Sequence, residues 1–357
     1  LWNKYLEVNR KMRIISCASY YATGSSAITN YLEEFDDCYS LTDYEFRFLY
    51  DPDGVSDLEF HLVENHHRHN SGYALKRFKR FVDELGNPYF KKYEHFFEGK
   101  WKIISNIYID RLTEFTYTGY WHQDVIDKGL FFYIRKRCLN KFLQHTVWKN
   151  QKERALNEMP KEITYCSYPS EEKFLEYTRA YTEELFNAAN RQNKTNVIVD
   201  QVVPPSNVNR YLRYFNDIKV FIVERDPRDV YLAEKYIYKG RVVPTESVEL
   251  YCKWYEYTRR HRNYEHFDNE KVMFVRFEDL IYNYDTMTKN INHWLGFSDS
   301  EHIHIKERFD PKISINNTRL WEKIPGVEQD VRYIEEHLPQ YLYPYSKENN
   351  GENSCGV

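Results

Sequence analysis

Short apolar segments that alternate with helical patterns are the feature that most constrains the fold of this chain. Four such segments each precede a helical pattern, and they read RIISCA (13–18), NVIVD (196–200), KVFIV (219–223) and VMFV (272–275). Apolar runs of this length are typical of strands buried on both faces. Strands that alternate with helices predict an α/β fold with a parallel sheet, which binds ligands at the carboxyl ends of its strands.

The first of these strands ends in a loop of small polar residues. The sequence from 19 to 27 reads SYYATGSSA, and a helical pattern follows over 25–36. The N–H groups that begin a helix lack internal partners and carry partial positive charge, so a Gly-Ser-Ser turn can hold a phosphate. The loop lacks the second glycine and the lysine of the G-x-x-x-x-G-K-[ST] pattern. A simple helix cap formed by Ser25 and Ser26 is the alternative interpretation.

Three later segments accompany this loop in a fixed order. They are VIVDQVVPPSNVNRYLRYF, KVFIVERDPRDVYLAEKY and VMFVRFEDLIYNYDTMTKNINHWLGF. Together with ATGSSAITNYL, they resemble the sulfotransferase family that uses 3'-phosphoadenosine 5'-phosphosulfate (PAPS). The resemblance covers 13–50 and 196–325 and leaves the middle of the chain unmatched. It implies a P-loop-like three-layer sandwich with a central parallel sheet.

The resemblance also implies which residues bind PAPS and its product PAP. Arg225 would bind the 3'-phosphate, because a planar guanidinium suits anionic oxygens. Arg228 would assist it, or would instead form an ion pair with Asp226 or Asp229. The loop residues would hold the 5'-phosphate and sulfate, and Arg319 would come from the segment in the place of the family's nucleotide-covering loop. The implied donor-binding residues are Thr23, Gly24, Ser25, Ser26, Ala27, Arg225, Arg228 and Arg319.

Two positions depart from the family pattern. Many members have a lysine or arginine two residues before the loop glycine, where this chain has Ala22. Many also have a serine eight residues after the arginine of R-[DN]-P, where this chain has Ala233. The first change removes a cation that would stabilise the bridging oxygen of the leaving group. The second removes a hydroxyl from the 3'-phosphate site. Other residues would have to supply these functions, or the donor is handled differently.

Sulfuryl transfer needs a general base that accepts the proton of the acceptor hydroxyl. Some family members place a glutamate on the second strand, which here corresponds to LTDYEFRF (41–48). We expect Glu45 to be this base and Arg47 to supply the charge missing at Ala22; a solvated strand face is the alternative interpretation. The histidines of HHRH (66–69) are a rival source of the base. Glu278 and Asp279 are expected to cap a helix and pair with Arg276.

The middle of the chain, 61–190, is predicted to be a large helical insertion. Residues 71–155 contain 17 Lys and Arg but nine Asp and Glu, whereas the whole chain has a net charge of −4. This asymmetry favours an anionic partner such as a polysaccharide, with Trp101, Tyr117, Tyr120 and Trp121 stacking on sugars. A solvated basic helix face is the alternative. No DNA- or RNA-binding motif accompanies the charge, so a nucleic-acid partner is not predicted.

The sequence therefore predicts one sulfotransferase-like domain over 12–345, followed by a disordered tail over 346–357. The predicted activity is transfer of a sulfuryl group from PAPS to a carbohydrate hydroxyl, without a metal. No apolar stretch is long enough to span a bilayer, and the predicted location is the cytoplasm. Two alternatives remain: a non-catalytic protein that binds PAP, and a kinase of the P-loop class, against which the missing lysine argues.

Overall fold

The computed structural model describes residues 12–345 apart from 91, 152, 158 and 241. The chain divides into two compact units, each with its own core. Unit 1 comprises Leu1–Leu49 and Ala189–Val357, and unit 2 comprises Tyr50–Ala188. The tail predicted to be disordered, 346–357, lies outside the described residues.

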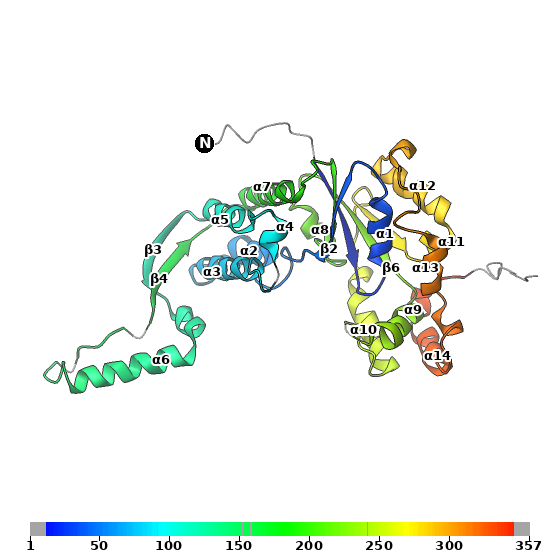
Figure 1. The fold of residues 1–357 in the computed structure, drawn as a ribbon. Coiled ribbons are helices and arrows are strands. Elements are labelled where there is room, and N and C mark those ends of the chain that lie inside the picture. Colours follow the sequence, from blue (N-terminus) through cyan, green and yellow to red (C-terminus); the bar gives the residue numbers. More distant parts are fainter. Residues whose placement is uncertain (1–11, 91, 152, 158, 241, 346–357) are drawn as a thin grey trace, which may run out of the picture. The chain divides into compact units, whose positions relative to one another are not determined.

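Unit 1 is built on a five-stranded sheet in which all paired strands are parallel (Figure 1). The strand order is β2-β5-β1-β6-β7. Their bounds are β1 (Arg13–Ser19), β2 (Cys38–Glu45), β5 (Asn196–Asp200), β6 (Ile218–Glu224) and β7 (Val272–Arg276). Helices flank the sheet, so the predicted α/β class with a central parallel sheet is confirmed.

The register of the central strands determines which loops meet at the carboxyl edge of the sheet. Cys17 of β1 lies beside Asp200 on one side and Phe221 on the other. Two residues further on, Ser19 lies beside Val223. The loop that follows Ser19 therefore starts next to the residues that follow β6. Parallel strands bring these two loops together although more than 200 residues of chain lie between them.

The helices of unit 1 bury apolar faces in two clusters. In α1 (Ser25–Leu32), Ala27, Ile28 and Tyr31 pack with the sheet residues Ile15 and Val223. The helix ends before the predicted residue 36, because Phe35 leaves it to form a β-bridge with His302. The other helices are α8 (Val208–Leu212), α9 (Pro227–Leu232), α10 (Val248–Arg259), α11 (Asp279–Tyr282), α12 (Tyr284–Leu295), α13 (Pro311–Ser314) and α14 (Glu328–His337).

Unit 2 combines helices with one two-stranded antiparallel sheet. Its core is rich in aromatic residues: the rings of Tyr108 and Tyr181 stack with centroids 4.4 Å apart, and both side chains are buried. The helices are α2 (Val55–Glu59), α3 (Arg68–Leu85), α4 (Tyr93–Phe96), α5 (Trp101–Leu112), α6 (His122–His145) and α7 (Glu171–Ala189). The strands of this sheet are β3 (Phe115–Tyr120) and β4 (Lys161–Cys166).

The β3–β4 sheet corrects the expectation that the middle of the chain is a helical insertion. The strand sequences FTYTGY and KEITYC contain the aromatic and β-branched residues that favour strands. The basic, aromatic helices on either side obscured this local signal. Pairing of Phe115 with Cys166 joins segments about 50 residues apart, and no short-range pattern predicts it.

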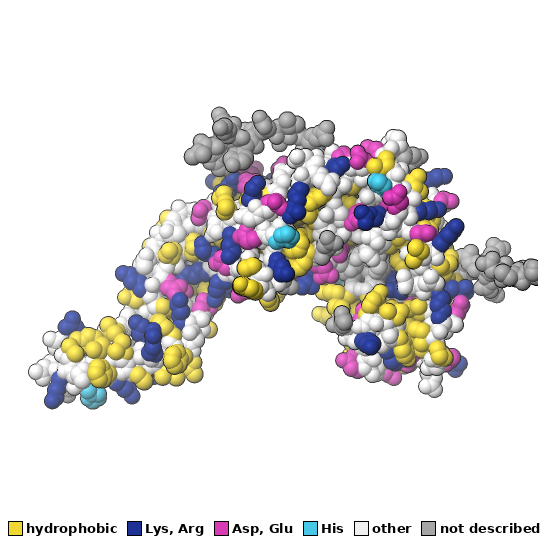
Figure 2. Space-filling view, viewed as in Figure 1, with side chains coloured by type: hydrophobic (Ala, Val, Ile, Leu, Met, Phe, Trp, Pro, Cys, Tyr) yellow, Lys and Arg dark blue, Asp and Glu magenta, His cyan; other side chains and the backbone are white. Residues whose placement is uncertain are grey.

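Helix α6 is interrupted and unusually exposed. Gly129 has φ 79° and ψ 169°, so the helix breaks there and starts again at Leu130. Apolar side chains gather with Lys and Arg on its surface (Figure 2). No helix in the described part of the chain is both long enough and apolar enough to cross a membrane.

The close contact between α3 and β4 generates a stability prediction. A Cβ atom on Gly72 would lie 2.2 Å from the backbone oxygen of Tyr165. Glycine to alanine in a helix ordinarily stabilises it by about 1 kcal/mol. Here overpacking outweighs this gain, so Gly72→Ala should lower the free energy of unfolding by about 2 kcal/mol. Urea titration measures the change. Glu84→Ala, at an exposed position of α3, should be nearly neutral, and a stabilised Gly72→Ala protein would contradict the packing argument.

Candidate functional site

The loop after β1 turns sharply before α1. Tyr21, Ala22 and Gly24 all have positive φ values, of 72°, 53° and 84°. Only glycine adopts this conformation without steric cost. A Cβ atom on Gly24 would also lie 2.7 Å from the ring of Phe277. Gly24 is therefore required both by the backbone turn and by the ring that packs against it.

The start of α1 has the properties of an anion-binding site. No acidic residue lies in its first turn and no side chain caps it. Ser25 is partly exposed and Ser26 is exposed, while the N–H of Ala27 bonds to the oxygen of Gly24 at 3.0 Å. Thr23 is completely buried, and its Oγ1 has no hydrogen-bond partner among the residues that the structure describes. An unpaired buried hydroxyl is costly unless a ligand or water satisfies it.

Arg225 links this loop to the end of β6. Its side chain is buried, with Nη1 donating to the oxygen of Ala22 at 3.2 Å and Nη2 to that of Asn317 at 2.5 Å. The guanidinium also lies 5.2 Å from the ring centroid of Phe277. Its Nε has no hydrogen-bond partner within the described residues. The sequence-predicted residues of the loop and of β6 therefore meet at one edge of the sheet.

Arg228 is held by the protein itself. Its Nε and Nη2 donate to the two carboxylate oxygens of Asp226 at 2.9 and 2.7 Å, and Nη1 donates to Glu335 at 2.7 Å. The guanidinium lies 3.9 Å from the ring centroid of Trp321. These are the contacts of a structural ion pair, the alternative interpretation of this arginine, so we leave Arg228 out of the proposed donor site.

The segment expected to cover the nucleotide lies beside Arg225. Asn317 supplies a carbonyl to Arg225, as described above, and the N–H of Arg319 donates to Asp229 at 3.0 Å. The Nε of Arg319 is 3.2 Å from Glu322, so its charge is balanced within the segment. Lys323 donates to three carbonyls of the same turn, including that of Thr318 at 2.8 Å.

The R-F-E-D-L sequence has different partners from those expected. Arg276 donates to the backbone oxygens of Tyr341 and Leu342, so its expected pairing with the acids is wrong. Glu278 instead accepts the N–H of Asp226 at 2.8 Å, just before α9 begins. Burial raises the pKa of Glu278 to about 8. Asp279 accepts the hydroxyl of Tyr343 at 2.8 Å. Both acids therefore have structural contacts.

Glu45 and Arg47 lie at the carboxyl end of β2. Glu45 is the last residue of the strand, with its side chain 48% exposed, and its carboxylate is 3.5 Å from Nη1 of Arg47. The strand register places Glu45 beside Asp200, the last residue of β5. Two carboxylates thus end neighbouring strands of the sheet, and β5 is the strand next to β1.

Asp200 is the residue whose importance the sequence interpretation missed. Burial raises the pKa of Asp200 to about 7, and the Glu45 carboxylate adds to this rise. Its Oδ1 is buried without a hydrogen-bond partner among the described residues. A carboxyl group whose pKa is close to neutral is suited to general-base chemistry. The acid at the end of NVIVD was the available signal, but its burial depends on the neighbouring strands.

The histidines proposed as a rival base belong to unit 2. His66 stacks on Tyr168 with centroids 3.7 Å apart, and its Nε2 is 3.0 Å from the oxygen of Ser167. His67 caps α3 by accepting the N–H of His69 at 3.2 Å. The described residues contain no group of three or more His, Cys, Asp or Glu suited to a metal ion.

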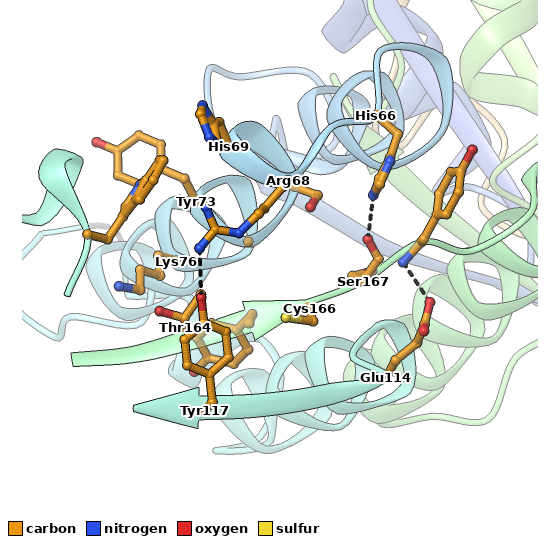
Figure 3. Close-up of a pocket in the computed structure, with 15 residues that line it drawn as sticks. His66, Arg68, His69, Tyr73, Lys76, Glu114, Tyr117, Thr164, Cys166 and Ser167 are labelled. Atoms are coloured by element: carbon orange, nitrogen blue, oxygen red, sulfur yellow. Dashed lines mark hydrogen bonds between the residues drawn. The ribbon is translucent and has the colours of Figure 1, made fainter. Parts of the chain in front are cut away.

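A second candidate site is a cavity of about 220 Å³ within unit 2 (Figure 3). Helix α3 and the β3–β4 sheet line it, with Tyr73, Tyr117, Trp121 and Tyr168 contributing aromatic rings. Arg68 donates to the hydroxyl of Tyr117 at 3.2 Å, across the cavity in Figure 3. Aromatic surface beside a few polar groups is typical of a small-molecule site.

Charge in this cavity is concentrated on one exposed arginine. Lys76 is 2.7 Å from the buried carboxylate of Asp124, which balances it. Arg68 is exposed and lies 5.6 Å from the ring centroid of Trp121, with no acidic partner in the described part of the chain. Glu114 also lines the cavity and accepts the N–H of Tyr168 at 2.9 Å. Arg68 is thus available to an anionic group of a ligand.

Solved sulfotransferase structures are among those that resemble this chain. The sulfotransferase domain of the Synechococcus PCC 7002 olefin synthase matches with a TM-score of 0.39 and 11% identity, over 94% of this chain and 95% of that one. The sulfotransferase STF9 from Mycobacterium avium matches with a TM-score of 0.37 and 12% identity, over 92% of this chain and 77% of that one. The sulfotransferase domain of the curacin biosynthetic pathway matches with a TM-score of 0.29 and 12% identity, over 64% of this chain and 82% of that one. Similarity this distant carries no argument about activity. No family model and no curated protein matches the chain.

The raised pKa of Asp200 generates a prediction about stability and pH. Between about pH 4 and pH 7 the unfolded chain ionises this group while the folded protein keeps it protonated, so stability falls as the pH rises. Asp200→Asn lacks this loss. Its stability relative to the natural protein should therefore increase over this range and level off above about pH 7.

Urea unfolding at several pH values measures the difference. Glu45→Gln is the matched control: it removes the neighbouring charge, so the pH-dependent loss should persist but shrink. Natural and Asp200→Asn proteins whose stabilities change in parallel from pH 5 to pH 8 would contradict the assignment.

Proposed function

We propose that this protein transfers a sulfuryl group from PAPS to a hydroxyl group of a carbohydrate. The observation that carries the proposal is the hydrogen bond from Arg225 to the oxygen of Ala22. It brings the loop that resembles the family's 5'-phosphosulfate loop together with the arginine that resembles its 3'-phosphate ligand. One nucleotide that carries phosphates at both positions can then contact both segments.

The unpaired polar groups at this edge fit such a ligand. Thr23 Oγ1 and Arg225 Nε are buried and have no partners within the described residues. The exposed start of α1 adds the N–H groups and hydroxyls of Ser25 and Ser26. Thr23, Gly24, Ser25 and Ser26 would hold the 5'-phosphate and the sulfate, and Arg225 the 3'-phosphate. The bound donor would supply the sulfuryl group for in-line displacement.

The two departures from the family pattern have a local physical basis. Ala233 is 1% exposed and belongs to an apolar cluster with Leu232 and Tyr251. Ala22 packs against the same cluster. Apolar residues at these positions contribute to the core. The corresponding donor contacts would therefore rest on Arg225 and the loop.

We assign the role of general base to Asp200, with Glu45 acting on its pKa. Asp200 is desolvated and has an unpaired carboxylate oxygen, whereas Glu45 is half exposed and ion-paired with Arg47. Both residues lie at the carboxyl edge of the sheet, and Asp200 lies on the strand next to the loop of β1. A base with a pKa near 7 accepts the acceptor proton efficiently at neutral pH.

We propose the unit 2 cavity as the place where the acceptor chain is recognised. Aromatic rings offer apolar faces to sugar rings, and Arg68 offers a cation to a carboxylate or sulfate on the chain. The reacting hydroxyl need not lie in this cavity, because a polysaccharide extends over many sugar units. The excess of basic residues over 71–155 also favours an anionic acceptor.

Binding of PAP tests the donor site directly. Arg225→Ala should weaken PAP binding about 10- to 100-fold, since a charge-assisted hydrogen bond contributes roughly 1.5–3 kcal/mol. Isothermal titration calorimetry measures the affinity. Arg225→Lys should fall between the two proteins, and Arg260→Ala, at an exposed position of the same unit, should bind PAP normally. ATP with magnesium should not bind like PAP; preference for ATP would favour the kinase alternative.

Turnover tests the base independently of donor binding. Asp200→Asn should keep its PAP affinity while sulfate transfer from labelled PAPS to a panel of anionic and neutral glycans falls about 100-fold. In the natural protein, transfer should rise with pH to a plateau above about pH 7, because the base must be ionised. Glu45→Gln should move this profile to lower pH. Loss of sulfate transfer in Glu45→Gln but not in Asp200→Asn would make Glu45 the base. PAP binding without transfer to any glycan would favour the non-catalytic alternative.

A further inference from the structure

The second part of α6, after the break at Gly129, presents an apolar stripe to solvent. Leu130 is 72% exposed, Phe131 80%, Ile134 47% and Phe142 63%. Phe131 and Leu130 precede Ile134 by three and four residues, and Phe142 follows Ile134 by eight, so helical periodicity places these side chains on one face. Large apolar side chains that gather on a surface mark an interaction site. Figure 2 shows apolar side chains gathered over α6.

The opposite face of this helix is already covered. Asn140 follows Phe131 by nine residues, which is two and a half turns, and so lies on the other side of the helix. Its side chain is buried and exchanges two hydrogen bonds with Leu156, of 2.9 and 2.7 Å. The segment after the helix therefore covers one face and leaves the apolar stripe exposed.

Positive charge accompanies the stripe, and this stretch of the sequence contains no acidic residue. From Lys128 through Lys149, with both ends counted, the sequence contains six Lys and Arg and no Asp or Glu. Arg135 and Lys141 are exposed, and neither forms an ion pair within the described residues. Lys128, before the break, pairs with Glu162 of β4 at 2.7 Å. Arg135 and Lys141 are therefore available to an anionic surface.

We propose that this segment of α6 binds the surface of an anionic lipid bilayer, lying in the plane of the interface. Exposed Leu, Ile and Phe would enter the boundary between headgroups and acyl chains, while Arg135 and Lys141 contact anionic headgroups. An apolar protein partner would not require a helix free of acids, and a polyanion such as a glycan would not require exposed Leu and Phe. A bilayer satisfies both properties. The inference uses no residue of the proposed donor site.

Co-sedimentation of the full chain with vesicles tests this surface. The chain should bind vesicles of equimolar phosphatidylcholine and phosphatidylglycerol, but bind phosphatidylcholine vesicles at least tenfold more weakly. Added salt should weaken binding to the anionic vesicles. The double variant Phe131→Ser/Phe142→Ser should lose at least tenfold in vesicle affinity, as should Arg135→Gln/Lys141→Gln.

A matched control separates this helix from exposed apolar residues in general. Ile303 and Ile305, in unit 1, are 52% and 62% exposed, and Ile303→Ser/Ile305→Ser should bind vesicles like the natural protein. Far-ultraviolet circular dichroism checks that each variant is folded, which is expected because the altered side chains are exposed.

Three results would overturn the proposal. The first is no binding to anionic vesicles, and the second is binding that the phenylalanine variant leaves unchanged. The third is self-association, detected by sedimentation velocity and lost in the phenylalanine variant, without vesicle binding; the stripe would then join two copies of the chain. PAP titration of the same variants should be unchanged, so failure here is distinguishable from failure of the donor site.

Discussion

The buried guanidinium of Arg225 is the interaction on which the candidate donor site depends. A desolvated cation must have its donors satisfied, and two of them bind the backbone oxygens of Ala22 and Asn317. These carbonyls belong to loops that follow β1 and α13, far from Arg225 in the chain. The arginine thereby determines how the loops meet above the sheet, and the packing of Gly24 against Phe277 leaves no space for a larger residue at the turn.

Two buried acids that follow Arg225 in the chain also hold loops in place. Asp226 accepts the N–H groups of Arg228 and Tyr343, and Asp229 accepts those of Arg319 and Leu320. Burial raises the pKa of Asp229 to about 6, whereas the nearby Arg225 lowers it. Two distant segments, at Arg319–Leu320 and at Tyr343, are thus joined by carboxylates to the residues that follow β6. The acids of R-D-P-R-D are therefore needed to hold the structure together, in addition to any contact of this motif with a nucleotide.

The two units carry complementary chemistry. Unit 1 provides a helix start, a buried arginine and a pair of carboxylates at one edge of a parallel sheet. Unit 2 provides an aromatic cavity with Arg68, which has no acidic partner among the described residues, and a basic helix with an exposed apolar face. The first set suits an anionic nucleotide and proton transfer, and the second suits recognition of larger anionic partners.

The sequence by itself determined four of the five strands of the parallel sheet, because buried apolar runs and the glycine turn are local signals; β2 was expected only from the family resemblance. It also identified the loop of Gly24 and the arginine after β6. Only the tertiary structure decided the partners: Arg228 binds Asp226, Arg276 binds carbonyls, and Asp200 lies beside Glu45. The β3–β4 pairing and the exposed stripe of α6 likewise depend on long-range contacts. Burial and pairing are properties of residues distant in the chain, so spacing within one segment cannot predict them.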